Sequence, residues 1–240
     1  MIAVKKKFLG AVLVAGVAGA VHAEQKQDVV WDSSAEVGYI LTSGNSDSET
    51  LISRFAAKAE YGDWEHKLDL EALNSSQNDA RSAEKYEAAL QSNYGVSERA
   101  YAFSRLDWEK DRFSAYDYQA SVVIGGGYKI IKTDAHDLRF ELAPGFRVSE
   151  PVTGGKQEEA IGRISEQYKW KISERAGLEQ SLSSEYGESN TRTKFKLAVT
   201  SQVNGSLSMK AGFQLKHNSD VAAGAEKTDR ETSLTLVYKL

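Results

Sequence analysis

From about residue 31 to the end of the chain, apolar side chains recur at every second position in a series of short runs. In the run 64–72, Trp64, Leu68 and Leu70 alternate with Glu65 and Asp69. Successive side chains of a β-strand point to opposite faces, so this period of two predicts strands with one apolar and one polar face. The pattern favours an all-β fold over any helical one.

The runs predict 12 strands joined in chain order, that is, a single antiparallel up-and-down transmembrane β-barrel. Gly62-Asp63 is typical of a two-residue hairpin turn. One run is irregular, because Tyr101 and Phe103 differ in parity from Leu106 and Trp108. If all four residues belong to the apolar face, a β-bulge must lie between them.

The first 23 residues are typical of a cleaved secretory signal peptide. Lys5, Lys6 and Lys7 precede the apolar stretch Phe8–Val21, and Val21-His22-Ala23 fits the small-x-small cleavage pattern. This stretch is shorter than a membrane-spanning helix needs. We therefore predict removal of residues 1–23, with residues 24–240 forming the outer-membrane barrel domain.

Connections between the predicted strands alternate in length, which suits a barrel whose termini both face the periplasm. Gly62-Asp63, 95–99, 173–175 and 204–205 are short, whereas 75–82, 111–115, 150–158 and 218–228 are longer and polar. Two connections depart from this rule: 129–136 is too long and 187–190 too short.

Aromatic residues gather near the strand ends, as in the interfacial girdles of membrane barrels. This set comprises Trp31, Tyr61, Trp64, Tyr94, Trp108, Tyr128, Trp170, Tyr186 and Tyr238. The general preference of aromatic residues for strands is the alternative explanation. Glu166 is an exception to the pattern, since it falls on the apolar face of its strand. Either the parity shifts there or the residue lies close to a membrane interface.

The charge balance argues against nucleic acid as a partner, and the cysteine count excludes disulfides. Of 30 basic residues, three lie in the signal segment, which leaves 27 basic against 34 acidic residues and a net charge of about −7. Such a chain offers no basic stripe for nucleic acid. It contains no cysteine, so disulfides cannot stabilise it.

The polar faces of the strands carry many charged residues, which we expect to line the lumen. The residues predicted to line it are Arg54, Lys58, Lys67, Asp69, Glu71, Arg105, Asp107, Glu109, Arg139, Glu141, Arg163 and Lys196. In the dry core of a soluble barrel, charges at this density would carry a prohibitive desolvation cost. Both signs occur in similar number, which predicts ion pairs across a narrow, obstructed interior without strong ion preference.

Four segments resemble the YdiY-like salt-induced outer membrane proteins, a family whose domain has no known function. They are Gly44–Thr50, Arg105–Phe113, Gly125–Tyr128 and Leu142–Arg147, and their spacing covers the chain after the signal segment. The resemblance implies an outer-membrane barrel without an established activity, produced under salt or osmotic stress. It carries over no catalytic residue.

Residence in the outer membrane implies contact with its lipids and lipopolysaccharide, and with the barrel-assembly machinery during insertion. Barrels of this kind usually end in an aromatic residue, whereas here Tyr238 stands two positions before the final Leu240. We expect this departure to weaken recognition by that machinery.

No catalytic, cofactor or metal site is predicted. His66, His136 and His217 are far apart and lack zinc-site spacing. The glycines 125–127 lack the Lys-Ser/Thr of a phosphate loop, and 44–49 lacks the ligand spacing of a calcium loop.

Two alternatives to a non-enzymatic narrow pore or structural envelope component remain. His217-Asn218-Ser219 could belong to a lipid-modifying enzyme of the outer membrane, although no orienting acid accompanies it. A soluble periplasmic ligand-binding barrel is the third hypothesis.

Overall fold

The computed structural model describes residues 29–42, 48–77, 80–112, 114, 116–152, 155–221 and 226–240. The predicted signal peptide, residues 1–23, lies outside this part of the chain. The strands are β1 (Val30–Thr42), β2 (Ser48–Tyr61), β3 (Trp64–Gln77), β4 (Ala80–Gly95), β5 (Ala100–Asp111), β6 (Tyr116–Lys132), β7 (His136–Pro151), β8 (Gln157–Lys171), β9 (Ala176–Gly187), β10 (Thr191–Gln202), β11 (Leu207–Asn218) and β12 (Thr228–Lys239).

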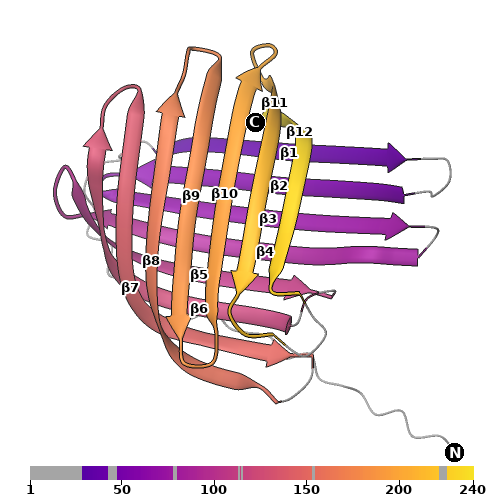
Figure 1. The fold of residues 1–240 in the computed structure, drawn as a ribbon. Helices are drawn as coiled ribbons and strands as arrows, with labels where there is room; N and C mark the ends of the chain where they lie inside the picture. The colour runs from indigo at the N-terminus through magenta and orange to yellow at the C-terminus, as the bar shows by residue number, and fades with distance from the viewer. Residues whose placement is uncertain are drawn as a thin grey trace, which may run out of the picture.

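These strands form one closed barrel in which every neighbour in sequence is also a neighbour in the sheet. All pairings are antiparallel, and β1 closes the barrel against β12 with Ala35 opposite Tyr238. The predicted all-β fold with 12 strands is therefore confirmed. In Figure 1 the strands of the front wall, β7–β11, cross those of the back wall, β1–β5, steeply. Closure leaves no free sheet edge for another chain to pair with.

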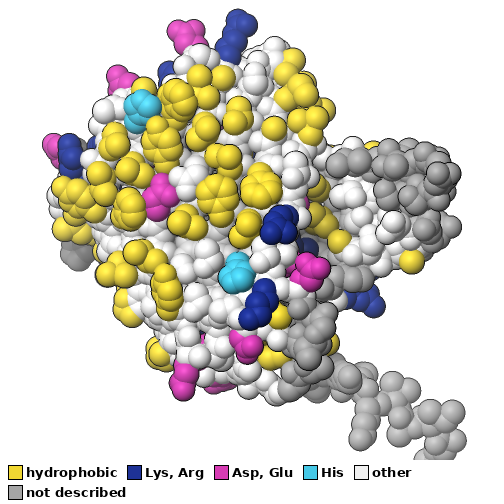
Figure 2. Space-filling model, viewed as in Figure 1, with side chains coloured by type: hydrophobic (Ala, Val, Ile, Leu, Met, Phe, Trp, Pro, Cys, Tyr) yellow, Lys and Arg dark blue, Asp and Glu magenta, His cyan; other side chains and the backbone are white. Residues whose placement is uncertain are grey.

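The outer surface of the barrel is apolar. Ile124, Leu142 and Phe146 are each exposed by about two thirds, at 67, 68 and 65%. Figure 2 shows hydrophobic side chains gathered in a broad area on one side of the barrel, with few charged side chains among them. Among the described residues, no helix is long and apolar enough to cross a membrane.

The predicted bulge between residues 101 and 108 is wrong. β5 pairs with β4 and β6 without a register shift, so parity is constant along the strand. Tyr101 and Phe103 point inward and are only 6 and 3% exposed, while Leu106 and Trp108 point outward. Register shifts occur elsewhere, at Ser75/Ser76, Tyr116/Tyr118 and Lys129/Ile131.

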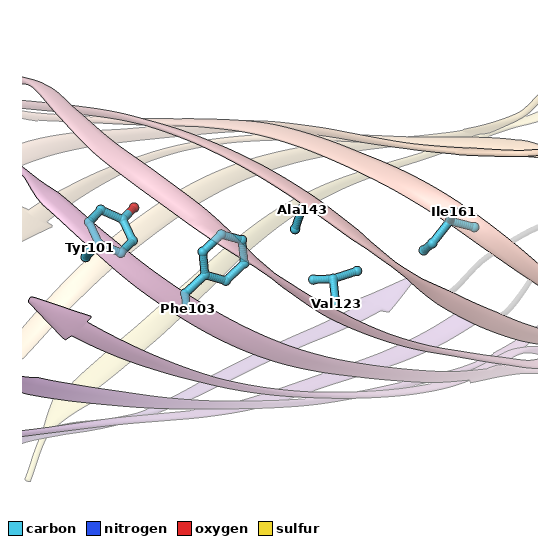
Figure 3. Packing of buried hydrophobic residues seen from close by; sticks show 5 residues of the cluster. All are labelled: Tyr101, Phe103, Val123, Ala143 and Ile161. Atoms are coloured by element: carbon cyan, nitrogen blue, oxygen red, sulfur yellow. The ribbon is translucent and has the colours of Figure 1, made fainter. Parts of the chain in front are cut away.

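Tyr101 and Phe103 belong to a small apolar cluster inside the barrel, together with Val123, Ala143 and Ile161 (Figure 3). These residues come from the four neighbouring strands β5–β8. Glycines let the wall pack closely beside the cluster: a Cβ at residue 127 would overlap the Tyr101 ring, and one at 125 would overlap Leu142 O and Ala143. The glycine-rich segment therefore serves packing rather than phosphate binding.

The barrel has two distinct ends. The chain enters β1 and leaves β12 at one end, named here the termini end, where the turns 62–63, 96–99, 133–135, 172–175 and 203–206 also lie. At the opposite end, the loop end, β1, β3, β5, β7, β9 and β11 finish and β2, β4, β6, β8, β10 and β12 begin. Two predicted lengths are wrong: strands extend into both the 129–136 and the 75–82 connections, because β6 continues to Lys132 and β3 to Gln77.

Most of the predicted girdle residues lie at the termini end. Trp64, His66 and Tyr94 form one aromatic group there, with the Trp64 and Tyr94 ring centroids 5.0 Å apart. His136 stacks between Tyr168 and Trp170 to form a second group. Amphipathic rings at one level around a barrel are typical of a membrane–water interface.

Candidate functional site: the charged interior

The polar strand faces enclose a cavity of about 980 Å³. All twelve residues predicted to line the lumen lie on its wall: Arg54, Lys58, Lys67, Asp69, Glu71, Arg105, Asp107, Glu109, Arg139, Glu141, Arg163 and Lys196. The turn 173–175 and Gln202 line it too, so the cavity extends to the termini end of the barrel. These residues come from all around the barrel, because the period of two directs every second side chain inward.

Near the termini end, most ion pairs follow the wall. Arg105 binds Asp107 two positions along β5, with Nη2–Oδ1 2.6 Å, and Arg139 pairs with Asp137 along β7 in the same way. Lys67 likewise reaches Glu65 on its own strand at 2.9 Å. One longer contact spans the interior, since Arg139 Nη1 on β7 lies 3.5 Å from Glu65 Oε1 on β3, four strands away.

Toward the loop end, ion pairs cross the lumen. Lys194 Nζ on β10 lies 3.2 Å from Glu87 Oε1 on β4, a strand six places away around the barrel of twelve. Lys216 on β11 reaches Glu109 on β5, again six strands away, at 2.7 Å. Arg192 also donates to Glu109. These contacts join opposite walls, so side chains rather than water fill this level.

At this level the residues that meet across the lumen differ in charge between the two walls. Glu71, Glu87 and Glu109 on β3, β4 and β5 are register partners and form an acidic row. Arg192 and Lys194 on β10 and Lys216 on β11 face this row and supply cations. We call these six residues the cross-lumen lock. The prediction of paired charges of both signs did not anticipate this separation, because strand register and closure are not visible in the sequence.

The exposed fraction of the inward-pointing side chains falls steeply from the termini end toward the loop end. The side chains of Lys169 and Glu179 near the termini end are 46 and 58% exposed. In the lock, those of Arg192 and Lys216 are 5 and 4% exposed, and that of Glu109 is 6% exposed. The interior is therefore a vestibule that opens at the termini end and is closed toward the loop end.

A second buried group strengthens this closure on the side of β7–β9. The Arg147 side chain is fully buried and pairs with Glu159 at 2.6 Å and Glu185 at 3.6 Å. It also donates to the Asn190 carbonyl. Buried charges require such partners, because each unpaired one would cost several kcal/mol.

Several of these residues were absent from the predicted lumen set. Arg192, Lys216, Glu185 and Lys85 share the inward parity of their strands, and parity alone could have identified them. Lys85 connects the lock to β12, since it lies 3.1 Å from Glu71 and 3.3 Å from Glu231. Their positions near strand ends concealed this role in the sequence.

Glu166 remains on the outer face of β8, and the parity does not shift there. It lies opposite Phe140 and Leu182. Its carboxylate accepts a hydrogen bond from Gln180 Nε2 at 2.8 Å. This bond compensates part of the cost of a polar group on the apolar face.

The histidines and the His217-Asn218-Ser219 segment can be placed in the described part of the chain. No group of three or more metal-binding side chains occurs in the described ranges. His217 Nδ1 lies 2.9 Å from Thr228 Oγ1, while Ser219 Oγ donates to Asn190 at 3.2 Å. Thus His217 and Ser219 have different partners and do not form a nucleophile–base pair. The predicted turn at 44–47 lies outside the described residues.

A closed barrel with an apolar exterior and a charged interior is the arrangement of a transmembrane β-barrel. Residues 35–240 match the family described as "Protein of unknown function, DUF481", and the chain belongs to this family. It is 27% identical to the uncharacterized protein YdiY of Escherichia coli (strain K12) over 216 residues, or 88% of this chain and 83% of that protein. The predicted family resemblance is confirmed.

Solved structures share the fold at low identity. The NanC porin is 6% identical and superposes with a TM-score of 0.54, covering 86% of this chain and 98% of that one. The translocator domain of the autotransporter NalP from Neisseria meningitidis is 11% identical, with a TM-score of 0.47 and 90% of both chains covered. The NanC likeness shows a common barrel fold.

Proposed function

We propose that this protein is an outer-membrane β-barrel without enzymatic activity, whose lumen forms a narrow pore closed by the cross-lumen lock. One observation carries the proposal: the surface is inverted relative to a soluble protein. Leu142 and Phe146 stand exposed outside, while Arg147 and Lys216 are buried inside. An apolar solvent outside the barrel and a polar lumen account for both features.

The proposal includes an orientation. Single-chain outer-membrane barrels place both termini and their short turns on the periplasmic side. The vestibule would then open to the periplasm, and the lock would separate it from the cell exterior. Solutes from the periplasm could enter as far as the lock, whose Glu87 and Lys194 line the cavity.

Fractionation and electrophoresis test this location. We expect the protein in the outer-membrane fraction, soluble only with detergent, and migrating differently on a denaturing gel before and after heating. Recovery as a folded, detergent-free periplasmic protein would contradict the proposal and favour the soluble binding barrel. The apolar outer face argues against that alternative, since exposed patches of this extent are rare on soluble monomers.

The enzymatic alternative is tested on the same sample. Phospholipid and lipopolysaccharide turnover should be absent, and His217→Ala should change nothing. Turnover abolished by that substitution would establish the lipid-modifying enzyme instead. The separate hydrogen bonds of His217 and Ser219 support the non-enzymatic reading.

Two parts of the proposal concern the cell rather than the fold. Production under salt or osmotic stress, which the family resemblance implies, predicts a higher protein level after an osmotic upshift. Insertion by the barrel-assembly machinery predicts that depletion of that machinery lowers the level of folded barrel.

A further inference from the structure

We propose that the outer face of β4–β5 at the loop end binds the phosphorylated head of an anionic glycolipid of the outer leaflet. The binding residues are Arg81, Lys110 and Arg112. The inference rests on the proposed outer-membrane location and orientation, which bring this end of the barrel to the outer leaflet. It adds a lipid site to a surface that the lumen does not use.

The three basic residues lie together and are open to the surroundings. Arg112 continues the β4–β5 ladder, since its backbone N donates to Glu84 O at 3.0 Å. Lys110 lies two inter-strand pairs below, on the same face of β5 and opposite Tyr86. The side chains of Arg81 and Arg112 are 54 and 65% exposed, and both bind Glu84, at 2.6 and 3.3 Å. Glu84 pairs with two of the three cations, and exposed Asp117 on neighbouring β6 is the second carboxylate nearby, so the group keeps an excess of one positive charge.

Lys110 is the cation most available to a ligand. Its side chain points outward on β5, between Tyr86 on β4 and Tyr118 on β6. Within the described ranges, no carboxylate lies in ion-pair distance of it. A basic residue flanked by tyrosines at the level of the lipid headgroups is well placed to hold a phosphate.

Below the cations, the wall becomes aromatic and then aliphatic. Trp108 is one outward position beneath Lys110, and Leu106 follows it. Leu106 is the register partner of both Leu90 and Val122, and these three side chains are 46–48% exposed. The order of cation, aromatic ring and aliphatic row matches an amphiphile with an anionic head and acyl chains.

The rest of the loop-end rim carries more acidic than basic side chains. In the described ranges its exposed carboxylates are Glu49, Asp117, Glu150, Glu158, Glu188, Asp220, Glu226 and Asp229, and its exposed cations are Lys156, Lys227 and Arg230. Asp117 lies nearest to the basic group, next to Tyr118, while Glu158 is neutralised by Lys156 at 2.6 Å. Charge complementarity therefore directs a phosphorylated headgroup to β4–β5 and away from the remaining strands.

The test is a binding titration of the full-length barrel, purified in a neutral detergent, with lipid A, a bisphosphorylated acylated disaccharide. Native mass spectrometry measures the bound fraction for the unmodified protein, Lys110→Gln/Arg112→Gln and Lys132→Gln. The last variant removes an exposed cation at the termini end and is the matched control. We expect about 30-fold weaker binding for the double variant, or about 1 kcal/mol per basic residue at about 1.4 kcal/mol per tenfold. The control should bind as the unmodified protein does.

Three outcomes would overturn the site: equal binding by the double variant, equal binding of dephosphorylated lipid A, or equally tight binding of phosphatidylglycerol. A change in gel mobility on heating, measured on each sample, reports whether the barrel is folded. Loss of that change in the unmodified protein would instead count against the proposed barrel function. The two failures are thus distinguishable.

Discussion

Glu109→Gln should destabilise the barrel more than any other single neutralisation in the lock. Glu109 accepts from Arg192, from Lys194 at 2.6 Å and from Lys216 at 2.7 Å. Its side chain is 6% exposed, so water cannot replace the lost charge. Removal of one member of a buried ion-pair group costs about 3–5 kcal/mol, because the remaining charges stay desolvated.

Asp107→Asn is the matched control. Asp107 lies two positions away on the same face of β5, but its side chain is 25% exposed and pairs with Arg105 on its own strand. A partly exposed pair of this kind contributes less than a fully buried one, about 1 kcal/mol. The structure therefore predicts a difference of several kcal/mol between two carboxylate-to-amide changes on one strand.

Denaturant unfolding of the refolded barrel measures this difference, and planar-bilayer recording measures its consequence. After Glu109→Gln, the lock carries unbalanced positive charge, so we expect more frequent openings with a preference for anions. The double variant Glu109→Gln/Lys194→Gln should recover part of the lost stability. Equal destabilisation by Glu109→Gln and Asp107→Asn would refute the cross-lumen arrangement.

Three further predictions follow from the two faces and the interior cluster. Leu236→Arg, on the outer face, should cost about 2–4 kcal/mol near the bilayer midplane, whereas Lys196→Arg in the lumen should be tolerated; equal unfolding energies would mean that the faces are misassigned. Phe103→Ala should cost about 3–5 kcal/mol, measurable by denaturant unfolding, and a neutral effect would show that the interior cluster does not pack. Arg105→Ala and Asp107→Ala should shift the reversal potential of any residual current in opposite directions, and shifts of the same sign would exclude them from the passage.

The fold was largely predictable because alternation is a local property of the sequence. Residues such as Leu90 and Ile124 lie on the outer face. The residues next to them along the same strand therefore point into the lumen. Tyr101 and Phe103 broke this rule. Their apolar character predicts an outward orientation, whereas these two pack inside against Val123 and Ala143. Room for them depends on glycines in the neighbouring strands, which only the paired sheet shows.

The cross-lumen lock could not be predicted from the sequence, for a different reason. Glu109 and Lys216 are 107 residues apart, and their contact follows from barrel closure and strand tilt rather than from any local pattern. The inward parity of Glu87 and Lys194 was visible, but which wall each belongs to was not. Charge separation between the walls is thus a property of the tertiary structure.

The one-sided opening of the lumen is tested most directly by cysteine labelling, because the chain has no cysteine of its own. Ser208→Cys places a thiol on the vestibule wall near the termini end, and Glu188→Cys places one in an exposed turn at the loop end. The reagent is a maleimide on a polymer too large to cross general porins. We predict that intact cells label only the residue-188 variant, and that opening the periplasm labels the residue-208 variant as well. Labelling of both variants at equal rates in intact cells would contradict a vestibule that faces the periplasm behind a closed lock.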